Sequence, residues 1–413
     1  MKKSHIVIFS TIMFFDYCGL FIILPILSPM ILANDNIFDV HNLSFLTLGS
    51  LVTMFGLGQF FGSPILGALS DYYGRKPLII TALLFSSLSY FLSALSIVFG
   101  SLIGLFLSRF LTGVSSGNSA ILFATVGDMS EVKERGRNMG YLTLGLALGG
   151  VIGPLLGGYL AQLPFSRAEQ EGDLPFILMS LIFLALTPFV SFINNGNLQY
   201  IKKINFSSKV FLKLSIENVF YVFRAPQYNI KILFFAFFTF ALSTEGLLVA
   251  LPIVATTKFH ANSIGLGWLF AIGGISSLIS GFFVNSFLSK KYNSMKNVII
   301  CLTLLVIAYL MFLPAFSYNY ILLPWVLMTS TCLLVWSHAN AVILDHYSAD
   351  KHGKIMGITQ SLVSLATLLS PLLVGLFAHF DIIAAFGVSL IFGLISWSLF
   401  LSYKIKSQSY EVV

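Results

Sequence analysis

Long apolar runs dominate this sequence and leave few folds open to it. Of its 413 residues, 57% are hydrophobic and only 9% are charged, and the mean hydropathy is +0.91. Soluble domains carry far more charge, whereas a helix that crosses a bilayer needs about 20 consecutive apolar residues. We therefore expect an all-α membrane protein with twelve transmembrane helices. The runs lie at residues 6–32, 44–70, 78–98, 102–127, 139–162, 174–193, 230–257, 263–289, 297–315, 319–344, 355–379 and 382–403.

The positive charges gather on one side of this predicted bundle. Of the 23 Lys and Arg residues, all but Arg109, Arg167 and Lys258 lie in or beside the tails and the loops that would share one side. Loops rich in Lys and Arg stay in the cytoplasm, so both termini are expected to be cytoplasmic. This asymmetry accounts for the net charge of +7, and we expect no nucleic-acid partner. The first run is too long for a signal peptide and is expected to be a retained helix.

The two halves of the chain are related in sequence. Asp128 and Pro154 align at one offset with Asp345 and Pro371. Two parallel six-span repeats predict a pseudo-two-fold axis along the membrane normal and a site near the midplane. The basic linker between them is either a helix on the cytoplasmic leaflet or an unstructured connection. We expect an N-terminal six-helix bundle, this linker, a C-terminal six-helix bundle and a cytoplasmic tail at residues 1–193, 194–229, 230–403 and 404–413.

Residues 105–160 contain a charged residue within one apolar run and a glycine-rich pattern in the next. Arg109 lies deep in an apolar run, where a charge costs about 2.5–3.5 kcal/mol and is rarely kept without a function. In the next run the glycines recur every fourth residue, so one small helix face can meet another backbone closely. The pattern indicates a tight contact in any membrane bundle or, with Arg109 beside it, a transporter. The face comprises Gly145, Gly149, Gly153 and Gly157, with Pro154 and Gly158 beside it.

The loop after the second run carries an ordered set of glycines and charges. It reads Gly67-Ala-Leu-Ser-Asp71-Tyr-Tyr-Gly74-Arg75-Lys76-Pro77. The glycines permit a tight turn, and the basic pair holds the loop at the cytoplasmic face. A cytoplasmic loop needs only the basic pair, so the complete order is a much more specific signal.

With these motifs the chain resembles the major facilitator superfamily over essentially its whole length, and within it the twelve-span drug:proton antiporters such as the tetracycline and multidrug exporters. The loop 67–77, Arg109 with Gly113, and residues 149–158 match signatures of that group. The resemblance implies a secondary transporter that exports a small amphipathic or cationic compound in exchange for protons by alternating access. It also implies a monomer in the bacterial inner (plasma) membrane that contacts a small molecule, protons and lipid, and needs no cofactor beyond the proton gradient.

The resemblance also implies roles for individual residues. Asp71, Arg75 and Asp128 would form a cytoplasmic charge network that opens as the halves rock. Arg109 would tune a nearby proton carrier, and the glycine face would guide the halves past each other. Ser89 stands where tetracycline exporters have an aspartate, so a tetracycline–magnesium chelate is not expected as substrate. The expected gating network comprises Gly67, Asp71, Gly74, Arg75, Lys76, Asp128 and Arg137.

Few ionisable side chains lie within the runs, and those that do are candidates for proton coupling. Asp16 and Glu245 lie at similar depths in the first and seventh runs. Burial favours the neutral form of a carboxyl group, and a nearby arginine favours its ionised form. Asp16 is therefore either a proton carrier or a structural partner of Arg109, and Glu245 is a candidate for coupling or for binding a cationic substrate. His338 would either relay protons or hydrogen-bond a carbonyl.

Polar and aromatic side chains within the runs are candidates for the substrate cavity, although each could instead face lipid or the helix core. Gln59 matches a substrate-contacting glutamine of the exporters. Cys18, Cys301 and Cys332 lie in different runs, and their spacing fits neither a disulfide framework nor a metal site. The sequence has no nucleotide-binding loop and no nucleophile triad, so we do not expect an enzyme. The cavity candidates are Tyr17, Gln59, Asn118, Trp268, Trp336, Asn340 and Gln360.

Other functions fit the same fold. A facilitator or importer of a metabolite or chelator would not depend on Asp16 and Glu245. A membrane receptor that no longer transports would have a closed cavity, and the intact motifs at 67–77 and 149–158 speak against it. A channel is disfavoured because the internal repeat and the glycine face suit rocking halves.

Overall fold

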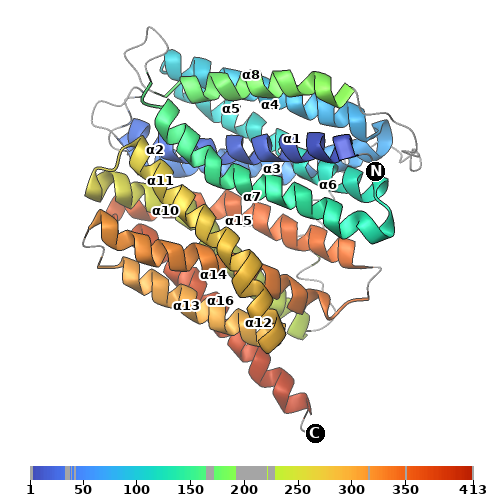
Figure 1. Ribbon diagram of the computed structural model, residues 1–413. Helices are drawn as coiled ribbons and strands as arrows, with labels where there is room; N and C mark the ends of the chain where they lie inside the picture. Colours follow the sequence, from blue (N-terminus) through green and yellow to red (C-terminus); the bar gives the residue numbers. More distant parts are fainter. Residues whose placement is uncertain are drawn as a thin grey trace. The chain divides into compact units, whose positions relative to one another are not determined.

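All regular structure in the described part of the chain is helical (Figure 1). The computed structural model describes residues 3–32, 38, 40, 43–163, 172–191, 221, 228–314, 317–348 and 351–411. Eleven helical stretches among these residues are long and apolar enough to cross a membrane. They coincide with eleven of the twelve predicted runs, which confirms an all-α membrane fold. The two-bundle arrangement and the cytoplasmic position of the termini stay predictions, and most of the linker lies outside the described residues.

The helices before the linker follow the predicted runs with two interruptions. The first span, Ser4–Leu32, consists of two helices that meet at a turn at Ile23. The fourth predicted span is broken as well. The helices are α1 (Lys3–Ile22), α2 (Leu24–Leu32), α3 (Ser44–Tyr73), α4 (Arg75–Val98), α5 (Leu102–Ser115), α6 (Asn118–Met129), α7 (Val132–Leu160) and α8 (Leu174–Ser191).

The helices after the linker include one π-helical turn, η2 (Ser280–Val284), inside the eighth predicted span. Such turns add one residue to the helix and commonly occur near functional sites. The α-helices are α10 (Tyr228–Phe259), α11 (Ser263–Ile279), α12 (Asn285–Lys291), α13 (Ser294–Phe312), α14 (Tyr318–Leu344), α15 (His352–Phe380) and α16 (Ala384–Glu411).

The break between α5 and α6 is the main departure from the predicted spans. The Ser115 hydroxyl donates to the carbonyl oxygen of Thr112 at 2.9 Å, and the Ser116 hydroxyl donates to that of Gly113 at 2.7 Å. Hydroxyls that bind carbonyls of their own helix compete with the backbone ladder and bend the helix. Gly117 follows, and a side chain there would lie 2.8 Å from the Cα of Ser63 in α3. Neither α5 nor α6 is therefore long enough alone to span a bilayer.

Contacts divide the chain into two units. The first contains Met1–Ser44, Met54–Leu214 and Ala261–Ala271, so the beginning of α11 belongs with α1 to α8. The second contains Phe45–Thr53, Ser215–His260 and Ile272–Val413, so the beginning of α3 belongs with α10 to α16. Within the first unit α1 packs along α7 and α4 lies between α5 and α8; within the second, α10 packs on α15 and α16 (Figure 1).

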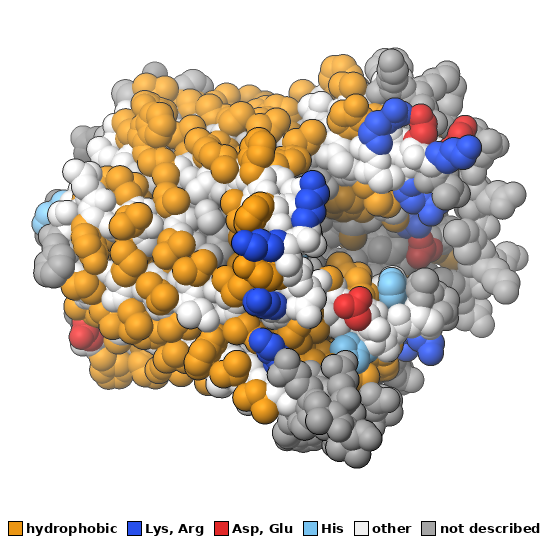
Figure 2. Space-filling view, turned by 60° about the horizontal axis from the view of Figure 1, so that its bottom comes forward, with side chains coloured by type: hydrophobic (Ala, Val, Ile, Leu, Met, Phe, Trp, Pro, Cys, Tyr) orange, Lys and Arg blue, Asp and Glu red, His pale blue; other side chains and the backbone are white. Residues whose placement is uncertain are grey.

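Each unit has an aromatic interior and an apolar exterior. Tyr90, Phe176 and Phe183 are buried in the first unit, and Phe240 and Phe312 in the second. Many large apolar side chains are nevertheless exposed, such as Ile103 in α5, at 83% of its full exposure. Figure 2 shows a wide area of hydrophobic side chains, with a row of Lys and Arg side chains along its edge and further charged side chains beyond that row. An exposed apolar belt is expected of helices that face lipid.

Candidate functional site

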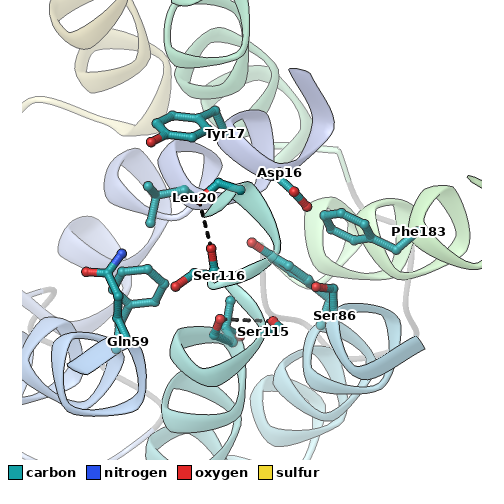
Figure 3. Close-up of a pocket in the computed structure, with 12 residues that line it drawn as sticks. Asp16, Tyr17, Leu20, Gln59, Ser86, Ser115, Ser116 and Phe183 are labelled. Atoms are coloured by element: carbon teal, nitrogen blue, oxygen red, sulfur yellow. Dashed lines mark hydrogen bonds between the residues drawn. The ribbon is translucent and has the colours of Figure 1, made fainter. Parts of the chain in front are cut away.

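A small polar pocket lies inside the first unit, walled by α1, α3, α4, α5, α6 and α8 (Figure 3). Asp16 is the one acidic residue among those that line it. The space open to the centre of a water molecule is about 40 Å³, which is room for a few waters. The lining residues are Asp16, Tyr17, Leu20, Phe55, Gln59, Ser86, Tyr90, Thr112, Ser115, Ser116, Ser119 and Phe183.

Asp16 is held by Asn118, the first residue of α6. The Asn118 amide Nδ2 donates to Oδ2 of Asp16 at 2.8 Å, and Asn118 is completely buried. An ionised carboxylate only accepts hydrogen bonds, so the amide must present its nitrogen to it. This leaves Oδ1 of Asn118 buried and without a hydrogen-bond partner in the described structure. Two of the residues predicted for coupling and for the cavity are therefore in direct contact.

Arg109 lies behind the pocket and is completely enclosed. Its Nη2 donates to the Ser93 hydroxyl at 2.6 Å, and its guanidinium carbon lies 5.5 Å from the ring centres of both Tyr90 and Phe176. Cation–π contacts of this kind stabilise a buried cation without a counter-ion. Tyr90 also lines the pocket, so the same ring contacts the arginine and forms part of the pocket wall. The structure thus pairs Asp16 with Asn118, and Arg109 with Ser93 and two aromatic rings.

Of the predicted cavity residues, Tyr17 and Gln59 line this pocket, and Asn118 is joined to it through its hydrogen bond to Asp16. Gln59 lies across the pocket from Asp16 (Figure 3). Trp268, in the part of α11 that belongs to the same unit, instead donates from its indole nitrogen to the Tyr159 hydroxyl at 3.2 Å and is 46% exposed. It is not among the residues of the pocket.

Glu245 belongs to the second unit, on α10. It is half-buried, and Thr367 on α15, whose hydroxyl donates to the Val363 carbonyl oxygen, lies close to its carboxylate. The next residue, Gly246, lies close to the Ser370 hydroxyl, which donates to the Leu242 carbonyl oxygen at 2.5 Å. Glu245 therefore has a polar neighbour on α15 that the sequence did not reveal.

The remaining candidates of the second unit lie on α14 and α15. His338 is buried, and its Nε2 lies 3.3 Å from the amide nitrogen of Asn297 on α13. Trp336 packs against Phe237 of α10, with ring centres 5.4 Å apart. Asn340 donates to the Trp336 carbonyl oxygen at 2.9 Å. Gln360, on α15, is exposed. His338 thus contacts a side-chain amide rather than a backbone carbonyl.

The charged loop between α3 and α4 forms a compact ionic cluster. Arg75 contacts Asp71 at 2.6 Å and Asp128 at 3.2 Å, and it donates to the Ser70 hydroxyl at 2.5 Å. Gly74 separates the two helices with φ of 96° and ψ of 155°, a conformation open mainly to glycine. The structure therefore brings together the three residues that the family resemblance placed in one network.

The other members of the predicted gating set lie around this cluster or apart from it. Lys76 donates to the Ser191 carbonyl oxygen at 2.7 Å, tying α4 to the end of α8. Arg137 pairs with Glu134 of its own helix at 2.6 Å and is 63% exposed. A side chain at Gly67 would meet no neighbour within 4 Å.

The glycine face of α7 packs against α1. Added side chains at Gly145, Gly149, Gly153 and Gly157 would collide with the carbonyl oxygens of Ser10, Phe14, Cys18 and Ile22 respectively. Pro154 and Gly158 instead lie against the beginning of α11, at Gly267 and Ser263. The four glycines thus join two helices of one unit closely, and α1, which carries Asp16, is positioned by them.

Several pocket residues escaped the sequence interpretation. Ser86, Ser115, Ser116 and Ser119 are small polar residues in apolar runs, and such residues are common where membrane helices pack. One signal was present: Ser115-Ser-Gly-Asn-Ser119 is a polar interruption of the fourth run. Gly58 and Gly62 were also missed, and they let α3 approach the backbone of α5 at Phe110 and Val114.

Comparison with known proteins yields one family. Residues 9–224 and 233–411 match the sequence profile of the Major Facilitator Superfamily. A tetracycline resistance protein of class H from Pasteurella multocida is 25% identical over 413 residues, covering 97% of this chain and 95% of that protein. Multidrug resistance protein 2 of Bacillus subtilis (strain 168) is 25% identical over 415 residues, covering 94% and 95%.

Solved structures share the fold at lower identity. A bacterial homolog of the human lysosomal transporter Spinster, in an inward-facing and unoccupied conformation, is similar with a TM-score of 0.78 and 15% identity, over 98% of both chains. The human organic anion transporter MFSD10 (TETRAN) is similar with a TM-score of 0.70 and 20% identity, over 97% of this chain and 100% of that one. At such identities the likeness concerns the fold.

Proposed function

The chain belongs to the major facilitator superfamily, and from this premise we propose that it is a proton-coupled secondary active transporter that exports a small amphipathic or cationic compound. Relatives that cover almost the whole chain are named for tetracycline and multidrug resistance. Their names support efflux as the direction and amphipathic drugs as the substrate class.

The observation that carries the proposal is the partly buried contact between Asp16 and Asn118. A carboxyl group in a small pocket of hydroxyls can exist charged, accepting from the Asn118 amide, or neutral, after taking up a proton. Intramembrane carboxyl groups are costly to keep and commonly serve as proton carriers. The pocket around Asp16 is lined by hydroxyl oxygens, from Ser86, Thr112 and the serines of the break. These oxygens can hydrogen-bond a water molecule that occupies the pocket and contacts the carboxylate.

Proton entry supplies the driving force in this scheme. Each proton that moves inward across the membrane contributes roughly 2.3 kcal/mol per 100 mV. Asp16 takes up the proton from outside and releases it to the cytoplasm, and the compound leaves in the alternate half of the cycle. Arg109 packs against the ring of Tyr90, which also lines the pocket, so a positive charge of the same unit lies close to the carboxyl group's surroundings. Glu245, beside Thr367, is a second carboxyl group suited to coupling or to binding a cationic substrate.

Transport into inside-out vesicles tests the proposal. Vesicles that contain the protein should accumulate ethidium when their interior is acidified, and dissipating the pH gradient with an ionophore should stop accumulation. Asp16→Asn should transport at the background rate under the gradient. Ethidium transport that is equally fast with and without a gradient in the wild-type protein would instead establish the facilitator.

A further inference from the structure

The break between α5 and α6 lies beside the one carboxylate of the pocket. Ser115 and Ser116 end α5, Ser119 is in the first turn of α6, and all three line the pocket with Asp16. Where a spanning helix is interrupted, its last carbonyls and unwound residues are suited to bind a coupling cation. This interruption therefore places oxygen atoms of two half-helices next to a negative charge from α1.

The serine hydroxyls at the break already donate their protons, so only their oxygen lone pairs can contact a ligand. Ser115, Ser116 and Ser119 donate to the carbonyl oxygens of Thr112, Gly113 and Ser116 at 2.9, 2.7 and 3.1 Å. A hydroxyl has one proton and two lone pairs. Since each proton is already engaged, each oxygen can only accept from a ligand, which suits a cation and disfavours an anion.

Asn118, which holds the Asp16 carboxylate, also carries an unsatisfied acceptor. Its amide nitrogen is committed to Asp16, and its Oδ1 is buried without a partner in the described structure. A buried acceptor that has lost its water is unfavourable unless a donor or a cation satisfies it. This unsatisfied oxygen belongs to the residue that holds the carboxylate of the pocket, although Asn118 is not itself among the residues that line the pocket.

The size and charge of the pocket limit which ligands can bind in it. The space of about 40 Å³ is too small for an amphipathic drug and fits an ion with a few waters. Hard metal cations prefer oxygen ligands. One carboxylate balances one positive charge, and the guanidinium of Arg109, stacked on Tyr90, opposes a second charge.

We propose that this pocket binds a small monovalent metal cation of the Na⁺ class, held by the Asp16 carboxylate and by the hydroxyl oxygens at the α5–α6 break. This inference rests on the proposed function, because it takes Asp16 as the coupling residue. Its new element is that Na⁺ and the proton compete for the Asp16 carboxylate. The carboxylate holds one or the other, so Na⁺ binding releases the proton. The other ionisable side chains that line the pocket are Tyr17 and Tyr90, and Tyr90 in turn lies close to Arg109 and Cys18.

The experiment uses the full-length wild-type protein in neutral detergent, titrated with NaCl against choline chloride at constant ionic strength. A ligand that binds the native state raises the midpoint of thermal unfolding as its concentration rises. We expect NaCl to raise the midpoint and to release protons into a weakly buffered solution, and choline chloride to do neither. Asp16→Asn should abolish the proton release, and Ser116→Ala should weaken the Na⁺ dependence by about tenfold, which is about 1.4 kcal/mol.

Ser398→Ala is the matched control. The Ser398 hydroxyl also donates to a carbonyl three residues earlier, that of Ile395 at 2.8 Å, but on the exposed side of α16. This variant should respond to NaCl like the wild type. A Na⁺ response that persists undiminished in both Asp16→Asn and Ser116→Ala would place the cation elsewhere and overturn the proposal.

Equal unfolding midpoints of the wild-type protein in NaCl and choline chloride would also overturn it, whatever the variants do. The same preparation separates this failure from failure of the proposed function. If tetraphenylphosphonium releases protons while NaCl does not, proton antiport stands and the Na⁺ site falls. If tetraphenylphosphonium binds and neither compound releases protons, both proposals fall.

Discussion

Asp16 and Asn118 lie on α1 and α6, and one partly buried hydrogen bond of 2.8 Å joins them. Hydrogen bonds to a charged group contribute about 1.5–3 kcal/mol, and a carboxylate left buried without its donor is destabilising. The same bond changes when the carboxyl group is protonated, because the neutral acid accepts less strongly than the carboxylate. One contact therefore affects both stability and coupling.

Replacing Asn118 tests this double role. In Asn118→Ala we expect the free energy of unfolding to fall by about 1.5–3 kcal/mol, and proton-driven ethidium transport to fall more than the amount of folded protein. Thermal unfolding and vesicle transport measure the two effects. Asn285→Ala is the control, since Asn285 receives only a weak bond of 3.5 Å from Ser289 on exposed α12. Unchanged coupling in folded Asn118→Ala would contradict the assigned role.

Arg75 allows a second test on single residues, in the charge cluster with Asp71 and Asp128. Both carboxylates are substantially exposed, at 39% and 42%, and exposed ion pairs contribute about 0–1 kcal/mol each. Arg75→Gln should therefore change the unfolding midpoint little while slowing ethidium transport several-fold, if the cluster controls a conformational step.

The control for this prediction is Arg137→Gln. Among the described residues Arg137 forms an ion pair only with Glu134 of its own helix, so its replacement should leave both the unfolding midpoint and the transport rate near the wild-type values. Equal transport by the two variants would show that the Arg75 cluster has no special part in the cycle.

At the scale of elements, the contact of α7 with α1 determines where Asp16 lies. The glycines of α7 leave no room for side chains, and a methyl group at Gly153 would lie 2.5 Å from the Cys18 carbonyl oxygen and 2.9 Å from the Cys18 Cα. Backbone atoms cannot move aside as a flexible side chain can. The two helices must therefore separate if the face is enlarged, and α1 carries Asp16 with it.

Gly153→Ala tests the importance of this close packing. We expect the free energy of unfolding to fall by about 1–3 kcal/mol, the usual cost of overpacking, and transport to fall with it. Gly140→Ala is the matched control on the same helix, because a side chain at Gly140 meets nothing within 4 Å. Alanine is also the better helix former by about 1 kcal/mol, so this control should be as stable as the wild type or more. If Gly153→Ala were as stable as the wild type and transported at the same rate, this account of the packing would be wrong.

At the scale of the whole molecule, local signals in the sequence predicted most of the fold. Apolar runs of the length of a bilayer identified the spanning helices, and the turn at Gly74 identified the charged loop, because both depend on neighbouring residues. The break at Ser116 was missed because hydrophobicity averaged over the fourth run concealed five consecutive small or polar residues. Hydroxyl competition for carbonyls, rather than any breaker such as proline, interrupts that helix.

The candidate site was less predictable because its contacts join distant parts of the chain. Asp16 and Arg109 are the two conspicuous charges of the early spans, so a pair between them was a reasonable interpretation. In the structure the rings of Tyr90 and Phe176 pack against Arg109, and Asn118 donates a hydrogen bond to the Asp16 carboxylate. Neither aromatic ring carries a local signal for that role, since buried aromatic residues are abundant in both units.

Proton release on substrate binding is the measurement that tests proton antiport through Asp16 most directly. Ethidium or tetraphenylphosphonium is added to the purified protein in weakly buffered detergent near neutral pH, comparing wild type with Asp16→Asn and Glu245→Gln. We predict that the wild type releases protons and that Asp16→Asn does not. The release should decrease as the pH is raised, because fewer carboxyl groups then hold a proton to lose. Binding of either compound to the wild type without proton release at any pH would contradict antiport, whereas loss of release only in Glu245→Gln would move the coupling residue to α10.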